Sequence, residues 1–191
     1  MKKLLLILIF TLSLQSLTKA DSISDFEIEG MSIGDSLLDF FNEKEIRSNI
    51  NYDGYSYIKD KKFVDFEIYE ENRFGKYDGV QISFKKNDKQ YLIHSIAAGI
   101  FYEEISICHS DMVEITNQVK LMFKNADTDL LKKLDHPEKK GTALSNWFNL
   151  EDGSISIMCT DWNKETEQAD GWYDNIRVEV RTKEFERWLT N

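Results

Sequence analysis

Apolar and polar residues alternate along several stretches of the chain, and this pattern predicts a sheet of antiparallel strands. In residues 63–69 apolar side chains alternate with Asp65 and Glu67, a period of two that is typical of a half-buried strand. Residues 91–101 are apolar on both faces, which favours a central strand. An Asp-Gly dipeptide between two later stretches predicts a tight hairpin. The remaining strands are expected at residues 55–58, 80–84, 142–150, 154–162 and 172–181.

Helical spacing of apolar residues predicts four helices. Ser32 and Asp35 fit a capping box ahead of a helix that carries Leu37, Leu38 and Phe41. The other helices are expected near residues 43–48, from residue 110 or 111 to residue 124, and at residues 183–189. The fold class is therefore α+β: an antiparallel sheet of about five to seven strands with an N-terminal helix pair, one long central helix and a short C-terminal helix.

Two polar segments are predicted to be loops. Residues 125–141 hold the only proline and many charges, so we interpret them as mostly loop with one helical turn near residues 129–134. They are also the candidate junction between two halves of the chain. Residues 163–171 are predicted to form a polar loop between strands.

The N-terminal residues have the three parts of a secretory signal. Two lysines precede an apolar stretch at residues 4–14, and the small residues Thr18 and Ala20 fit a cleavage site. The apolar stretch is too short for a membrane span, which needs roughly 20 residues. The alternative, a buried N-terminal helix, is disfavoured because the stretch has no polar face. We expect a signal peptide at residues 1–20, a single α+β domain at residues 21–191, a periplasmic or secreted location, and no membrane anchor after cleavage.

The chain is acidic, with a formal net charge of −10. Removal of residues 1–20 removes three lysines and no acidic residue, which leaves 21 basic and 34 acidic residues and a net charge of −13. Such a chain repels phosphate backbones and anionic lipids, so a nucleic-acid partner is excluded. A cationic partner remains open.

The two cysteines, Cys108 and Cys159, are expected to form a disulfide, because oxidising compartments allow such bonds to persist. The alternative is two buried free thiols.

The segment from Cys108 to Asp111, which includes His109, is the most reactive-looking group in the chain. A free thiol at the start of a helix has a lowered pKa and can act as a nucleophile, which gives one alternative function: a thiol- or carboxylate-dependent hydrolase centred on Cys108 and His109. Neither an H-E-x-x-H motif nor a C-x-x-C pair is present, and no glycine-rich loop follows a strand. We therefore predict no catalytic residue, no metal ligand and no cofactor.

Aromatic residues beside acids concentrate in the last quarter of the chain. Trp162, Trp172 and Tyr173, together with Asp161, are the candidate binding residues, since exposed aromatic side chains beside acids suit recognition of sugars, peptides or a cationic protein patch. Ordinary core and rim packing is the alternative.

The segment FEIEGMSIGDSLL at residues 26–38 resembles the opening of uncharacterised exported bacterial proteins. Residues 28–32 also resemble the opening of small periplasmic modules typified by the BamE/SmpA assembly lipoproteins and the β-lactamase inhibitor protein. That resemblance implies two helices laid on an antiparallel sheet. The chain departs from the lipoproteins because it has neither a lipobox cysteine nor a Gly-x-Pro after the first helix, so no functional residue is transferred.

Together these features predict an exported domain that binds a protein or a small molecule without catalysis. The partner and the oligomeric state stay open at this level.

Overall fold

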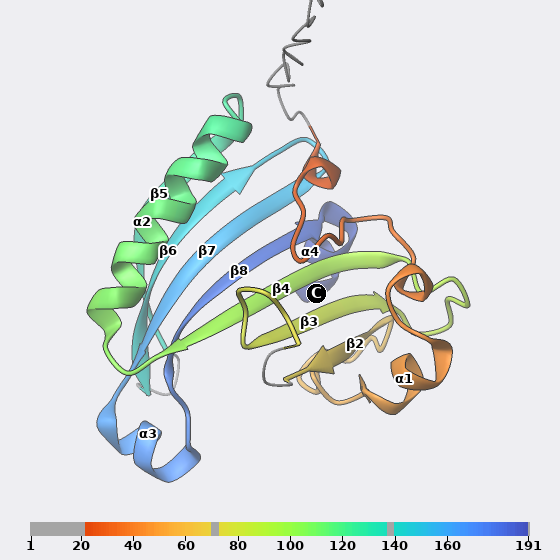
Figure 1. Ribbon diagram of the computed structural model, residues 1–191, viewed down its shortest axis with the longest axis horizontal. Coiled ribbons are helices and arrows are strands. Elements are labelled where there is room, and N and C mark those ends of the chain that lie inside the picture. Colours follow the sequence, from red (N-terminus) through yellow and green to blue (C-terminus); the bar gives the residue numbers. More distant parts are fainter. Residues whose placement is uncertain (1–21, 70–72, 137–139, 191) are drawn as a thin grey trace, which may run out of the picture.

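One antiparallel sheet of eight strands, in the order β1-β2-β3-β4-β8-β7-β6-β5, forms the centre of the fold (Figure 1). The computed structural model describes residues 22–69, 73–136 and 140–190, so the predicted signal peptide lies outside the described residues. The strands are β1 (Ile50–Asn51), β2 (Phe63–Ile68), β3 (Gly79–Lys85), β4 (Ile93–Tyr102), β5 (Asp127–Asp135), β6 (Gly141–Asn149), β7 (Gly153–Trp162) and β8 (Asp174–Thr182). The α+β class is confirmed, and the predicted strand number is too low.

In the described residues, four α-helices accompany the sheet: α1 (Glu43–Ser48), α2 (Ile105–Met122), α3 (Lys164–Asp170) and α4 (Lys183–Leu189). The long central helix and the short C-terminal helix are confirmed, although α2 begins before the predicted residue. Of the predicted pair of N-terminal helices, the second is present as α1, but the first is not an α-helix. Ser36 caps a 3-10 helix of three residues, Leu37–Asp39, which follows a second 3-10 helix at Ile23–Asp25.

The two groups of strands have matching topology. The chain runs from α1 through β1 to β4, then from α2 through β5 to β8. β4 and β8 pair antiparallel at the centre of the sheet, with Ala97 opposite Glu179 and Gly99 opposite Arg177. A helix followed by four strands therefore occurs twice, with α3 inserted between β7 and β8 in the second group. The β4–β8 pair joins the two groups.

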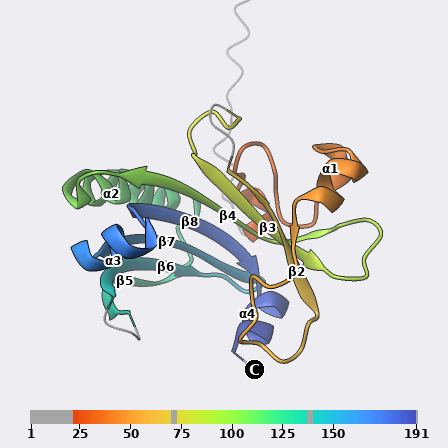
Figure 2. The ribbon, with the colours of Figure 1, turned by 90° about the horizontal axis from the view of Figure 1, so that it is seen from below.

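The two faces of the sheet differ in cover and in chemistry. One face is apolar and packs against α1, α2 and the N-terminal segment, where Ile82, Ile96 and Val178 are completely buried. On the other face α4 packs against β4, β7 and β8, and Figure 2 shows it on the opposite side from α1 and α2. A small second core lies between α4 and the sheet. It is formed by Phe185 and Trp188 of α4 with Phe63 of β2, and Tyr55 packs against it. The rest of this second face, over β2, β3, β4, β8 and β7, is called the open face.

Three predicted segments differ from the structure. Residues 127–135 of the expected loop form β5, whose side chains are nearly all exposed, so no hydrophobic period marks it. A register shift between Asp129 and Lys132, with a positive φ at Leu131, disturbs its alternation further. Residues 55–58 form turns, and β1 pairs with β2 instead.

The third difference is α3, which lies within the expected polar loop at residues 163–171. Asn163 accepts a hydrogen bond from the backbone N–H of Thr166 at 2.8 Å, and Gly171 ends the helix with a φ of 68°. This N-cap and the left-handed glycine at the C-terminus are sequence signals for a helix.

The disulfide between Cys108 and Cys159 is present, with an S–S distance of 2.01 Å and a Cα–Cα distance of 6.0 Å. It ties α2 to β7 on the apolar face, and both cysteines are buried. The predicted pairing is therefore confirmed. Within the described ranges, no helix is long and apolar enough to cross a membrane.

Candidate functional site

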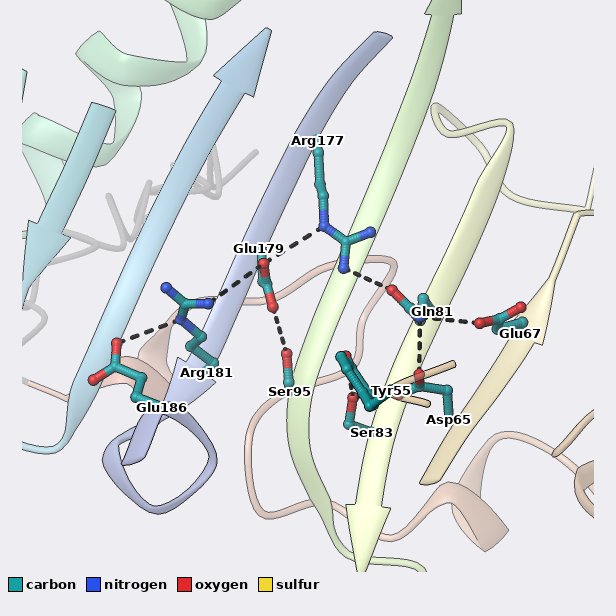
Figure 3. A network of polar contacts seen from close by, with 10 residues as sticks. All are labelled: Tyr55, Asp65, Glu67, Gln81, Ser83, Ser95, Arg177, Glu179, Arg181 and Glu186. Atoms are coloured by element: carbon teal, nitrogen blue, oxygen red, sulfur yellow. Dashed lines mark hydrogen bonds and ion pairs between the residues drawn. The ribbon is translucent and has the colours of Figure 1, made fainter. Parts of the chain in front are cut away.

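A connected network of polar side chains crosses the open face from β2 to α4 (Figure 3). Successive side chains of a strand point to opposite faces, and directly paired residues share a face. In β2 and β3, Asp65 is paired with Ser83 and Glu67 with Gln81. The register of the sheet thus places the polar residues of these alternating strands on the same face.

Arg177 of β8 lies at the centre of this network. Its Nη2 donates a hydrogen bond to Gln81 Oε1 at 2.6 Å, and Gln81 Nε2 donates at 3.0 Å to both Asp65 Oδ2 and Glu67 Oε1. Arg177 Nε lies 3.5 Å from Glu179 Oε2. The amide of Gln81 therefore links a guanidinium on one side to two carboxyl groups on the other.

Asp65 is a completely buried carboxyl group. It accepts a hydrogen bond from Ser83 Oγ at 2.6 Å. Burial, with a smaller contribution from the neighbouring Glu67, raises the pKa of Asp65 to about 7 against the opposing effects of the Ser83 hydrogen bond and Arg177. Because the side chain has no exposed surface, it cannot contact a substrate. We interpret it as part of the hydrogen-bonded polar side chains at the base of the open face, which are called the polar floor.

Glu179 extends the network toward α4. Its Oε1 accepts a hydrogen bond from Ser95 Oγ at 3.1 Å, and its Oε2 lies 4.0 Å from Arg181 Nη1. The Arg181 guanidinium lies 4.6 Å from the ring centroid of Trp147, and its Nε is 3.4 Å from Glu186 Oε1. These contacts hold the charged side chains in one arrangement, which lowers the entropic cost of meeting a partner.

Exposed aromatic side chains border this polar floor. Tyr69, which is 61% exposed, lies against Gly79 of β3. Phe101 and Tyr173, 45% and 61% exposed, contact each other with ring centroids 6.3 Å apart. Exposed aromatic rings beside fixed polar groups are typical of protein-binding surfaces.

Two of the four predicted binding residues, Trp162 and Trp172, meet at one end of the open face, whereas Asp161 lies on the opposite face of β7, with Cys159. The rings of Trp162 and Trp172 are 4.6 Å apart, and His136 lies 5.3 Å from Trp162. Trp162 and Asp161 line a cavity of about 640 Å³. Tyr173 does not line this cavity and lies beside Phe101 instead.

This cavity is connected to the polar network through a second cavity, because the two cavities share Trp162 and His136. The second cavity, of about 440 Å³, is lined by Trp162, His136 and Met158 and also by Arg177. The Trp162 end and the Arg177 network are therefore parts of one surface.

The residues of the alternative hydrolase do not form a catalytic pair here. Cys108 is buried and bonded to Cys159, so it presents no thiolate in this state. His109 is exposed on α2 and lines a cavity of about 210 Å³ beside Lys133 and Asp161. Among the described residues, no group of three or more His, Cys, Asp or Glu side chains is arranged to hold a metal ion.

Sequence analysis missed the central residues of the network: Gln81, Arg177 and Glu179. Their polar positions within alternating strands are visible in the sequence, where they suggest an ordinary solvated face. The pairing of β4 with β8 brings Arg177 beside Gln81, although 96 residues separate them along the chain. The available signal was the presence of charged residues at alternate positions of two strands: Asp65 and Glu67 in one, Arg177 and Glu179 in the other.

Comparison with known proteins returns no relative. No protein-family model matches the chain, and no curated protein or solved structure is significantly similar to it. Conclusions about function therefore depend on the geometry of the open face.

Proposed function

We propose that this is an exported, periplasmic or secreted, domain that binds a protein partner through its open face without catalysing a reaction. The observation that carries the proposal is the border of exposed aromatic side chains, Tyr69, Phe101 and Tyr173, beside a polar floor that is already hydrogen-bonded. Tyr, Trp and Arg are the residue types that dominate binding energy at protein interfaces.

The chemistry of the surface favours a partner with basic groups around its contact area. Without residues 1–20 the net charge is −13, so long-range attraction would steer a cationic surface toward the protein. At the Trp162 end of the sheet, Asp161 is exposed and Glu167 is half-buried. Charges at such a rim act mainly on the association rate and its salt dependence.

A triple variant tests the role of the open face: Tyr69→Ser, Phe101→Ser and Tyr173→Ser. The matched control replaces three exposed apolar residues of α2, on the other side of the sheet, by serine: Ile107, Val113 and Leu121. After chemical crosslinking in the producing cells, we expect the open-face variant to lose the adduct that the parent protein forms, because truncated anchors cost about 2 kcal/mol or more each. The α2 variant should keep it. Equal adduct from both variants, or its loss only in the α2 variant, would contradict the proposal.

Export has a separate test. Mass spectrometry of the protein purified from its producing cells should find a chain that begins at Asp21, because Thr18 and Ala20 fit a signal-peptidase site. The mass should also be lower by two hydrogens, as the disulfide requires. An intact Met1 in a cytosolic fraction would overturn the proposed location.

A further inference from the structure

The open face contains a small, well-bounded hollow between Tyr69 and Phe101. Its volume is about 170 Å³, and Gly79, Ala97 and Gly99 form its base. Arg177 of β8 also lines it. The hollow is therefore walled by two exposed aromatic rings and reaches the centre of the polar network.

The hollow exists because three small residues stand where the neighbouring strand positions carry large side chains. Gly79 is the direct partner of Gly99 across β3 and β4, and Ala97 is the partner of Gln81. A Cβ atom at Gly79 would overlap the ring of Tyr69, so this glycine allows the ring to lie against the strand. Glycine in the interior of a strand often marks close approach of a ligand or another chain.

Gly99 has a different role. A Cβ atom there would meet only the carbonyl oxygen of Ile176, at 3.6 Å, which is ordinary van der Waals contact. Neither space nor backbone conformation therefore requires a glycine at this position. A side chain at residue 99 would project into the hollow, so the missing side chain is what keeps the hollow empty.

The size and lining of the hollow select a planar ring. A buried cavity of about 150 Å³ holds one benzene molecule, so about 170 Å³ accommodates the ring of one side chain. Aromatic walls favour tilted or edge-to-face contacts with such a ring. Arg177 uses Nη2 for Gln81 and Nε for Glu179. Its Nη1 has no hydrogen-bond partner in the part of the chain that the structure describes, and it can donate to a hydroxyl oxygen or a ring face.

The charges around the hollow favour a neutral occupant. A carboxylate beside Arg177 would also face Glu67 and Glu179, which already interact with the same network. A cation would face the Arg177 guanidinium directly. A tyrosine side chain avoids both costs, because it is planar, uncharged at neutral pH and carries an acceptor oxygen.

We propose that the hollow between Tyr69 and Phe101 receives one aromatic side chain, of the tyrosine type, from the protein partner. This inference rests on the proposed function and specifies the anchor of that interface. An aromatic residue in a central pocket is the usual form of an interface anchor.

The direct test uses N-acetyl-tyrosine amide as the probe and N-acetyl-leucine amide as its control. In 1H–15N spectra the tyrosine probe should shift the amide signals of Gly79, Ala97 and Gly99, and the leucine probe should not. Gly99→Val fills the hollow with a side chain suited to a strand and should weaken probe binding by about tenfold or more, equivalent to ~1.4 kcal/mol. Gly99→Ala should weaken it less, and thermal unfolding checks that both variants are folded.

Each result separates the inference from the proposed function. Unchanged probe binding in Gly99→Val, or equal shifts with the leucine probe, would overturn the assignment of the hollow. Retention of the partner adduct in Gly99→Val, with its loss in the open-face triple variant, would overturn the hollow and leave the proposed function standing. Retention in both variants would overturn both.

Discussion

Replacement of both cysteines, Cys108→Ala with Cys159→Ala, is expected to lower the free energy of unfolding by about 4 kcal/mol, because the bond closes a loop of roughly 50 residues in the unfolded chain. The two residues are 51 positions apart. The bond also ties α2 to β7, so its loss removes the covalent link between the long helix and the sheet. Urea unfolding of the oxidised parent and of the double variant, followed by circular dichroism, measures the difference.

The control for this prediction is the reduced parent protein. Reduction should produce nearly the same loss as the double variant, since both remove the link and leave the surrounding side chains almost unchanged. A loss below about 1 kcal/mol in both, in contrast to the range of 2–5 kcal/mol for native disulfides in small secreted domains, would show that the bond does little for stability.

The second large effect is a pH-dependent stabilisation by Asp65→Asn. The pKa of Asp65 is raised from 3.8 to about 7 in the folded protein, chiefly by burial. A raised carboxyl pKa contributes stability that is fully present below the unfolded pKa and is lost as pH rises through the folded value. The parent should therefore lose stability between about pH 4 and pH 8 relative to the variant, by up to roughly 4 kcal/mol at ~1.4 kcal/mol per pKa unit.

Measurement of the free energy of unfolding of both proteins from pH 4 to pH 8 tests this sign. The matched control is Asp53→Asn, at an exposed carboxyl group, which should give a nearly constant difference across the range. A difference between Asp65→Asn and the parent that stays flat, or that shrinks as pH rises, would contradict the burial of an ionisable group at the base of the open face.

The regular elements with strong periodicity were predictable from the sequence. β2, β3, β7 and β8 alternate apolar and polar residues, β4 is apolar on both faces and α2 carries an apolar stripe, so each was expected near its observed position. β5 was not predictable in this way because it is an edge strand whose two faces are both largely exposed. The first N-terminal helix was overestimated, since the Ser32–Asp35 pair forms a capped turn that leads only to a 3-10 helix.

The candidate site was predictable only in part. Trp162, Trp172 and Asp161 were selected as aromatic residues beside acids, and the two tryptophans do meet at one end of the open face, whereas Asp161 lies on the opposite face of β7. Arg177 and Gln81 were missed because their contact depends on strand order, which local sequence does not determine. The order β3-β4-β8 places Gln81 and Arg177 on the two strands that flank β4.

Position-specific photo-crosslinking from the two sides of the sheet tests the central claim most directly. A photoreactive phenylalanine placed at Tyr69 or Tyr173 should form one adduct of the same mass in the producing cells, because both side chains are exposed on the open face. The same residue at Val113 or Leu121 of α2 should not form that adduct. An adduct that arises equally from α2, or that is missing from both open-face positions, would contradict the assignment of the open face as the binding surface.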